Sequence, residues 1–347
     1  MLRKMIGASL PGDMTTKLYE HTVAEPGMGM VVVEMKAVTL CGSDKGLYRG
    51  SFPFFRDPQQ IAGHEGSGVV VETGNGANRF HQGDRVILYH ASGCGCCGYC
   101  RRGMVNLCKQ SHGTYGFQRN GVLSKYVLAE EKDLIALPDG VSFEDAAALA
   151  CSFSSGYSAV KKLGISGRDA VFVSGLGPVG LGILMNAKAM GANLLLAADD
   201  NQYRRDLAQR IGIVTDAVET SKAYDLVMEH TKGRGVEKSF DASGTTAGRQ
   251  LAESVLREYG TAAFMGEGEE YAMSGRDIMG LIHGERQITG SWAVPLWEIE
   301  ELLELIERWN IHPADMITHR YSLREIDLAF RTAMGEQCGK VAIVDFD

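Results

Sequence analysis

The sequence contains no uninterrupted apolar run of about 18 residues, which is the length that a membrane-spanning helix requires. Residues 1–20 include basic side chains, but their apolar stretch is too short for a secretory signal peptide. We therefore expect a soluble protein that works in the cytoplasm, with no membrane partner.

Long basic runs are absent as well, and the formal net charge is −8, so the sequence has no electrostatic footprint for nucleic acid. Prolines are few, at 8, whereas glycines number 43, a balance that indicates tight turns rather than disorder. No internal repeat and no low-complexity linker interrupts the 347 residues. A chain of this length exceeds one ordinary core, so we expect two domains.

Two kinds of secondary-structure pattern divide the chain. Short β-branched runs at 30–36, 68–72 and 85–88 predict a β-rich first region. Later, a helix is expected over 145–163. A strand at 170–174 then leads through a glycine turn into a helix that ends at 190, and a second strand at 194–198 leads into a helix at 204–211. Further strands are expected at 238–241 and 261–265, with helices between them. This alternation predicts a doubly wound parallel sheet. A helix over 297–309 and a strand in GKVAIVDF end the pattern.

The most specific signal is a cluster of four of the eight cysteines. Cys94, Cys97, Cys100 and Cys108 have the spacing C-x2-C-x2-C-x7-C in a glycine-rich segment, 93–108. In a reducing cytoplasm such clusters favour metal over disulfides, and four thiolates form a closed tetrahedral zinc site. Cys96 does not fit the spacing and is interpreted as a bystander, with local exchange for one of the four ligands as the alternative.

A glycine motif follows the predicted strand at 170–174. The segment Ser174-Gly175-Leu176-Gly177-Pro178-Val179-Gly180 precedes a predicted helix. In that context it is a dinucleotide fingerprint, in which the glycines make the turn, admit the pyrophosphate and allow close helix packing. The free N–H groups of the helix would bind the phosphates.

The cysteine cluster, then ACSFSSGYS and then GLGPVG occur in the order seen in zinc-containing medium-chain alcohol and polyol dehydrogenases. The sequence resembles that family, within the medium-chain dehydrogenase/reductase superfamily, over essentially its whole length. The resemblance implies an α/β protein with a GroES-like catalytic domain (1–150 and 291–347) and a Rossmann NAD-binding domain (151–290). It also implies a homodimer or homotetramer.

The resemblance further implies a catalytic zinc site with an open fourth position. Its ligands would be Cys41 in CGSD, His64 in GHE and Cys151 in ACSFSSGY, a Cys2His set typical of alcohol dehydrogenases. Many polyol dehydrogenases of the family have Glu at the third position, so Cys151 favours the alcohol-dehydrogenase branch. Such a zinc ion would acidify an alcohol so that its carbon can release hydride to the nicotinamide.

Three neighbours of these ligands receive roles from the same resemblance. Ser43 would pass the substrate proton outward, and Asp44 and Glu65 would be carboxylate partners of the site. As alternatives, Asp44 could simply cap a turn and Glu65 could be solvated. Relatives often have His where this chain has Gly46, so the path beyond Ser43 must use cofactor ribose, water or another side chain. Lys340 matches a position often seen in the family, but a solvated lysine would explain it equally well.

The cofactor is expected to be NAD. Asp199 ends the second strand of the glycine-motif unit, where a carboxylate binds ribose hydroxyls and repels a 2′-phosphate. Arg204 lies where NAD-using relatives often have a basic residue near the ribose. Asp200 is a competing candidate, and Arg204 and Arg205 together weaken the preference for NAD.

The substrate pocket is predicted only in outline. From the resemblance, His90 faces the substrate, and its polar ring suits a hydroxylated substrate. The function that this favours is hydride transfer between a secondary alcohol or polyol, such as a sugar alcohol or cyclitol, and NAD. The alternatives are a simple primary alcohol dehydrogenase and a catalytically silent NAD sensor; acidic charge opposes a zinc-ribbon nucleic-acid binder. Other pocket candidates are Tyr48, Phe52, Phe117, Phe153 and Trp292.

Overall fold

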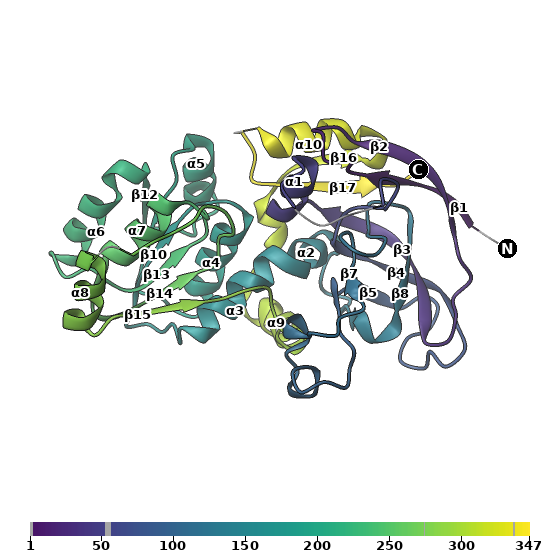
Figure 1. Ribbon diagram of the computed structural model, residues 1–347, viewed down its shortest axis with the longest axis horizontal. Helices are drawn as coiled ribbons and strands as arrows, with labels where there is room; N and C mark the ends of the chain where they lie inside the picture. The colour runs from purple at the N-terminus through teal and green to yellow at the C-terminus, as the bar shows by residue number, and fades with distance from the viewer. Residues whose placement is uncertain (1–2, 53–56, 274, 336) are drawn as a thin grey trace. The chain divides into compact units, whose positions relative to one another are not determined.

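The computed structural model describes residues 3–52, 57–273, 275–335 and 337–347. It divides into two compact units, one formed by Met1–Ser154 with Val294–Asp347 and the other by Ser155–Ala293 (Figure 1). Each unit packs a buried apolar core of its own. Among the described residues, no helix has the length and apolarity needed to cross a bilayer.

The first unit is built on a seven-stranded, mainly antiparallel sheet. Its strands lie in the order β16-β17-β3-β4-β5-β9, and β8 pairs with β3. The long strand β3 begins with the β-branched run expected at 30–36 and extends beyond it. Its carboxyl end pairs with both β4 and β17. The strands of this unit are β1 (Arg3–Ser9), β2 (Lys17–Val23), β3 (Met30–Thr39), β4 (Glu65–Thr73), β5 (Arg85–Leu88), β6 (Ala91–Ser92), β7 (Gly113–Thr114), β8 (Tyr126–Glu130), β9 (Leu134–Ala136), β16 (Ile317–Ser322) and β17 (Lys340–Asp345).

Few helices belong to this unit. The Ser142 side chain caps α2 by accepting a hydrogen bond from the Asp145 N–H at 3.0 Å. The expected acidic helix near the end of the chain is confirmed as α9. The helices are α1 (Gly42–Tyr48), α2 (Phe143–Ala148), α9 (Leu296–Trp309) and α10 (Ile326–Met334), with short turns η1 (Cys100–Arg102), η2 (Val105–Leu107), η3 (Glu131–Asp133), η4 (Leu149–Phe153), η6 (Pro313–Met316) and η7 (Leu323–Glu325).

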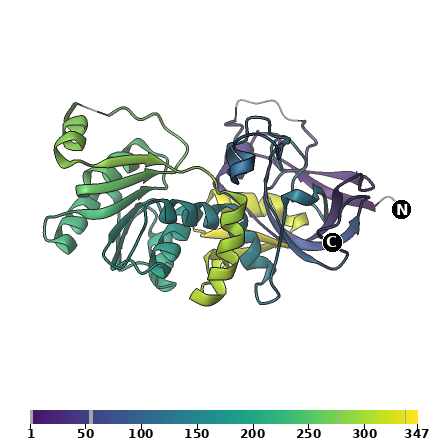
Figure 2. The ribbon, with the colours of Figure 1, turned by 90° about the horizontal axis from the view of Figure 1, so that it is seen from below.

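The second unit is a six-stranded, fully parallel sheet in the order β12-β11-β10-β13-β14-β15. This is the doubly wound order, and Figure 2 shows its strands lying between helices. The strands are β10 (Ala170–Ser174), β11 (Leu194–Ala198), β12 (Asp216–Val218), β13 (Val236–Asp241), β14 (Leu256–Phe264) and β15 (Gln287–Gly290). The helices are α3 (Ser154–Lys162), α4 (Pro178–Ala189), α5 (Gln202–Arg210), α6 (Ala223–Thr231), α7 (Thr246–Ser254) and α8 (Gly275–Gly284), with the turn η5 (Thr220–Lys222).

The parallel sheet reverses its strand order between β10 and β13. Ligands of such sheets bind outside the carboxyl ends of the strands at this switch point. The glycine motif follows β10 and the segment after Asp241 follows β13, so both loops lie at that edge. The α/β class with a parallel sheet predicted from the sequence is confirmed.

Candidate metal centres and cofactor site

The first unit brings Cys41, His64, Glu65 and Cys151 together, with one ligand atom of each lying within 4.8 Å of the others. Cys41 precedes α1 at the end of β3, and His64 and Glu65 meet it at the start of β4. Cys151, which is far from these residues in the sequence, lies in a helical segment. Two thiols and an imidazole are a zinc-ligand set, so the residues present fit that metal.

Asp44 connects two of these ligands. Its Oδ2 accepts a hydrogen bond from the Cys41 N–H at 2.8 Å, which closes the first turn of α1, and its Oδ1 lies 3.0 Å from His64 Nδ1. Asp44 is fully buried, so it both caps the helix and partners the imidazole. A proton on Nδ1 leaves Nε2 free to ligate, as is common for histidine ligands with a carboxylate partner.

Ser43 lies on the same turn of α1. Its Oγ is 3.5 Å from His64 Nε2, at the long end of hydrogen-bond range, and the side chain is partly exposed. A hydroxyl can accept one proton while it donates another, so its place beside the ligand nitrogen suits proton transfer.

Cys151 lies in a π-helical segment, η4, between α2 and α3. The sequence predicts one continuous helix here, and the helical state is confirmed, but the π turn was not predicted. Such single-turn insertions occur frequently at functional sites, because they change the direction of one side chain without ending the helix. The turn sets where the Cys151 thiol points relative to Cys41.

The two thiols of this cluster are unequal. The Cys151 thiol donates a hydrogen bond to the Cys41 sulfur, which lowers the pKa of Cys41 well below its ordinary value and raises that of Cys151. Burial opposes protonation of His64, but the Asp44 carboxylate and the Cys41 sulfur together raise the pKa of the imidazole well above its ordinary value. The shared hydrogen bond therefore favours the thiolate of Cys41 and the protonated thiol of Cys151.

Glu65 is buried and its two oxygens are fully engaged. Oε2 accepts from Thr39 Oγ1 at 2.8 Å and Oε1 accepts from the Ser152 N–H at 2.9 Å. Lys340 Nζ lies 2.5 Å from Oε2. The alternatives in which Glu65 and Lys340 are solvated are therefore wrong, since both side chains are 0% exposed. Thr39 and Ser152 were missed, because nothing in the sequence marks them.

The four lobe cysteines also converge, with sulfurs within 4.8 Å of one another. Backbone N–H groups point at the sulfurs: Cys97 N–H donates to Cys94 Sγ and Cys94 N–H to Cys108 Sγ, each at 3.4 Å. Donation from the backbone of Cys96 and Cys97 lowers the pKa of the Cys94 thiol to about 6. Cys96 itself is exposed, and its Sγ lies 3.7 Å from Cys94 Sγ. The tetrad fits a closed zinc site.

In the second unit, the glycine motif forms the turn from β10 into α4. Gly175 has a φ of +95°, which a side chain rarely adopts, and Gly177 caps α4 with Pro178 in the first turn. A Cβ on Gly180 would lie 1.8 Å from the Gly175 carbonyl oxygen, whereas a Cβ on Gly177 would meet open space. Gly177 therefore leaves room at the amino end of α4, where N–H groups can bind phosphates, and the Val179 side chain is partly exposed there.

Asp199 reaches back to this turn. Its Oδ2 accepts from the Leu176 N–H at 2.7 Å and lies 3.7 Å from Arg204 Nη1. Asp200 instead accepts from the Thr220 N–H at 2.9 Å. Asp199 is therefore the acidic residue beside the glycine turn.

The loop after β13 adds a second polar group to this edge. Asp241, buried at the end of the strand, accepts from the N–H groups of Ser243 and Gly244. Sequence interpretation missed it, although D-A-S-G directly after a strand is a usable signal in a parallel sheet.

The pocket candidates do not form one group. His90 and Phe117 contact the His64 ring, with centroids 5.4 and 5.2 Å away, and Phe52 packs on Phe117. Burial lowers the pKa of His90 to about 3, and its Nδ1 has no partner among the described residues. Tyr48 instead stacks on Phe330 at 5.0 Å.

The remaining two aromatics differ in exposure. Phe153, in η4, is fully buried, which is consistent with a role in core packing. Trp292 belongs to the second unit, is 56% exposed and donates to Glu267.

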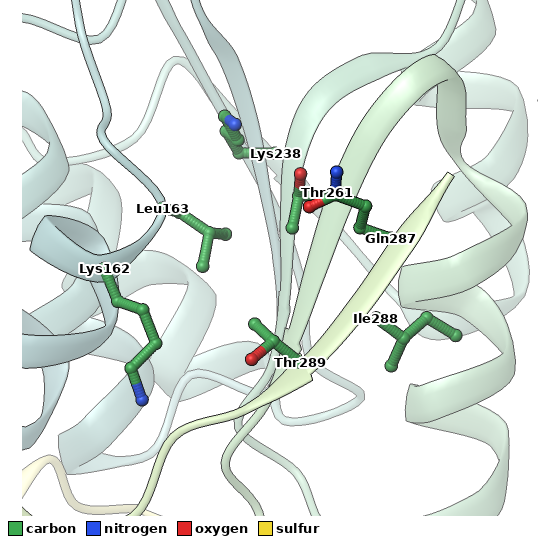
Figure 3. A pocket seen from close by; sticks show the side chains of 7 residues that line it. All are labelled: Lys162, Leu163, Lys238, Thr261, Gln287, Ile288 and Thr289. Carbon is green, nitrogen blue, oxygen red and sulfur yellow. The ribbon is translucent and has the colours of Figure 1, made fainter. Parts of the chain in front are cut away.

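A hollow in the second unit is unrelated to these residues. It measures about 530 Å³ and is lined by Lys162, Leu163, Lys238, Thr261, Gln287, Ile288 and Thr289 (Figure 3). Lys238, Thr261 and Gln287 form one row across β13, β14 and β15, three residues before the carboxyl end of β13. The hollow therefore contains none of the glycine-motif residues.

Two family models match the chain. The alcohol dehydrogenase GroES-like domain matches residues 27–139, and the zinc-binding dehydrogenase domain matches residues 178–308. An uncharacterized zinc-type alcohol dehydrogenase-like protein of Escherichia coli is 36% identical, with 99% of each chain covered. Sorbitol dehydrogenase of Halalkalibacterium halodurans is 32% identical, covering 95% of this chain and 96% of the relative. D-arabitol-phosphate dehydrogenase of Enterococcus avium is 30% identical, covering 95% and 94%.

Solved structures share the fold. Acetophenone reductase of Geotrichum candidum, in complex with NAD, has a TM-score of 0.86 at 26% identity over 99% of this chain and 98% of its own. A zinc-binding dehydrogenase of Sinorhizobium meliloti, bound to NADP, has a TM-score of 0.88 at 24% identity over 99% of both chains. Matches to both family models and these relatives over nearly the whole length show that the chain belongs to the zinc-containing medium-chain dehydrogenase family.

Proposed function

We propose that this chain is a zinc-dependent dehydrogenase that transfers hydride between a secondary alcohol or polyol and NAD. The observation that carries the proposal is the convergence of Cys41, His64 and Cys151, with Asp44 holding the imidazole. Three protein ligands leave a fourth position for substrate, which is the arrangement of a catalytic rather than a structural zinc site.

Bound there, zinc would supply Lewis acidity toward the substrate oxygen. The chain's own residues do the rest. Asp44 keeps the proton on His64 Nδ1, so that Nε2 is available as a ligand. Ser43, beside that nitrogen, accepts the proton of the substrate hydroxyl. Because Gly46 offers no side chain, the proton then leaves Ser43 through water or the cofactor ribose.

The second unit would bind the cofactor. The turn at Gly175–Gly180 would offer N–H groups of α4 to the pyrophosphate. Asp199, which accepts a hydrogen bond from the Leu176 N–H of this turn, would bind the adenosine ribose hydroxyls. A carboxylate at that place repels the 2′-phosphate of NADP, which supports NAD. The two units would accordingly be a catalytic domain and a cofactor domain. Their boundaries lie at Ser154 and Val294, a few residues after the boundaries at 150 and 291 that the resemblance implies, so Cys151 belongs to the catalytic unit.

The environment of the metal cluster supports a hydroxylated substrate. The His90 ring lies beside His64, and its buried Nδ1 has no hydrogen-bond partner among the described residues. With the ring proton on Nε2, this nitrogen would accept a hydrogen bond from a substrate hydroxyl. Similarity to sorbitol and D-arabitol-phosphate dehydrogenases supports the same class. Cys151 as third ligand favours the competing idea, a simple primary alcohol.

The test is NAD reduction by protein of known zinc content, measured over primary alcohols, secondary alcohols, sugar alcohols and cyclitols. We expect turnover of one or more polyols or secondary alcohols, with kcat/KM higher than for primary alcohols. Cys41→Ala serves as a control that removes the catalytic ligand. Preference for primary alcohols would support the alternative enzyme, and no turnover with two zinc ions and bound NAD would indicate an NAD sensor.

Assembly and location complete the proposal. We propose a cytoplasmic homodimer or homotetramer, as the family relationship suggests. Light scattering of the purified protein measures the assembly directly, and a monomeric mass would contradict it.

A further inference from the structure

Lys340 is a charged side chain buried without any solvent contact. It begins β17, and its Nζ lies 2.5 Å from Glu65 Oε2, 2.7 Å from Ser152 Oγ and 3.5 Å from the Leu40 carbonyl oxygen. Burying an ammonium group costs several kcal/mol unless it is paired and hydrogen-bonded. All of its close partners surround the metal cluster rather than the core.

The Glu65 carboxylate is the group that this ammonium controls. One of its oxygens lies within 4.8 Å of the ligand atoms of Cys41, His64 and Cys151. A carboxylate is itself a good zinc ligand, so Glu65 is close enough to compete for the fourth position. Both oxygens, however, already accept hydrogen bonds from Thr39, Ser152 and Lys340.

We infer that Lys340 is a positioning residue that holds the Glu65 carboxylate away from the fourth coordination position and so keeps this position available to substrate. The inference rests on the proposed metal site. Without the Lys340 ammonium, the Glu65 carboxylate would remain buried beside a divalent cation and would have lost the cation that now pairs with it. It would then turn to the metal.

The experiment uses protein loaded with cobalt, whose visible spectrum reports ligation, and imidazole as a probe of the fourth position. In Lys340→Met, we expect imidazole to bind about tenfold or more weakly, in the range found for mutations of ligand partners. In Lys340→Met/Glu65→Gln, the affinity should return to within about twofold of the wild type, because the competing carboxylate is gone.

Three controls separate positioning from general damage. Lys340→Arg retains the charge and should keep the wild-type spectrum. Lys125→Met removes a lysine whose ion pair with Asp347 lies on the surface of the same unit, and it should change nothing at the metal. Glu65→Gln alone should keep the visible spectrum of the wild type, because Glu65 is not a ligand while Lys340 is present.

The outcomes distinguish a failure of the inference about Lys340 from a failure of the proposed metal site. If Glu65→Gln alone changes the cobalt spectrum, Glu65 already ligates and the inference is wrong, even where Lys340→Met fails to fold. Equal loss of imidazole binding in the single and double variants would show a merely structural role. Failure of the wild type to bind cobalt outside the cysteine lobe would instead overturn the proposed metal site.

Discussion

At the scale of single residues, the metal cluster joins side chains that are inconspicuous in the sequence. Cys41 follows a strand, His64 precedes one and Cys151 lies inside a helix, so no local spacing links them. Asp44 shows how one carboxylate serves two purposes, since one oxygen caps α1 and the other orients His64. The interpretations of Asp44 as a cap and as a ligand partner are both compatible with this geometry.

Replacing Cys151 tests the third ligand. Cys151→Ala should remove about one zinc ion per chain and abolish activity, because two remaining protein ligands bind the metal too weakly. The fold should persist, since alanine suits the helix. Elemental analysis and circular dichroism measure both effects, with Cys96→Ala as the control that keeps its metal. Two ions retained in Cys151→Ala would mean that another residue ligates.

Replacing Asp199 tests cofactor choice. Asp199→Gly removes the carboxylate that repels a 2′-phosphate, so the ratio of kcat/KM with NADP to kcat/KM with NAD should rise about tenfold, equivalent to ~1.4 kcal/mol. Damage to the glycine turn lowers both values and leaves the ratio unaffected. Asp200→Gly is the matched control. A shift in the ratio for Asp200→Gly alone would assign the ribose contact to Asp200.

At the scale of elements, the turn from β10 into α4 separates two uses of glycine. Gly180 has no room for a side chain because the helix packs on the turn, whereas Gly177 faces open space with an ordinary φ of −70°. Gly180 is therefore required by the fold, whereas Gly177 leaves room for a ligand.

A pair of variants distinguishes these uses. Gly177→Ala should leave the free energy of unfolding nearly unchanged and weaken NAD binding about tenfold or more, because its methyl group enters the phosphate space. Gly180→Ala should destabilise the protein by about 1–3 kcal/mol, the cost of overpacking, as well as weaken NAD binding. Denaturant unfolding and calorimetry measure the two quantities. Equal destabilisation by both variants would contradict the distinction.

The segment from α2 to α3 shows a limit of sequence interpretation at this scale. Alanine-rich periodicity predicts a helix over 145–163, and that is confirmed. The π turn at Leu149–Phe153 has no compositional signal, because it depends on which backbone register best satisfies the surrounding contacts. Strands β1 and β2 were also not predicted, since their half-exposed pattern lacks a buried apolar run.

At the scale of the whole molecule, the two metal clusters belong to one unit and the glycine motif to the other. Each unit has its own apolar core, so a ligand of one unit should stabilise that unit first.

Hydrogen exchange measures this separation. Removing metal with a chelator should speed amide exchange around residues 94–108 and 149–153 and leave β10 and β11 protected. Adding NAD should slow exchange around Gly175–Gly180 instead. Equal loss of protection in the central strands of both units after chelation would show that the units unfold together.

The sequence by itself determined the parallel-sheet unit, the glycine motif and the cysteine lobe. In each, the informative residues are neighbours along the chain: β10 and β11 are short buried runs, and the lobe ligands fall within 94–108. Local periodicity and ligand spacing are therefore sufficient.

Only the tertiary structure decided what surrounds the catalytic cluster. Lys340 could equally have been solvated, and Thr39 and Ser152 carried no signal, yet all three meet Glu65 in the buried interior. They come from β3, η4 and β17, whose meeting depends on long-range packing of strands and helix. Burial then gives their charges and hydrogen bonds a strength that the same residues would lack in water.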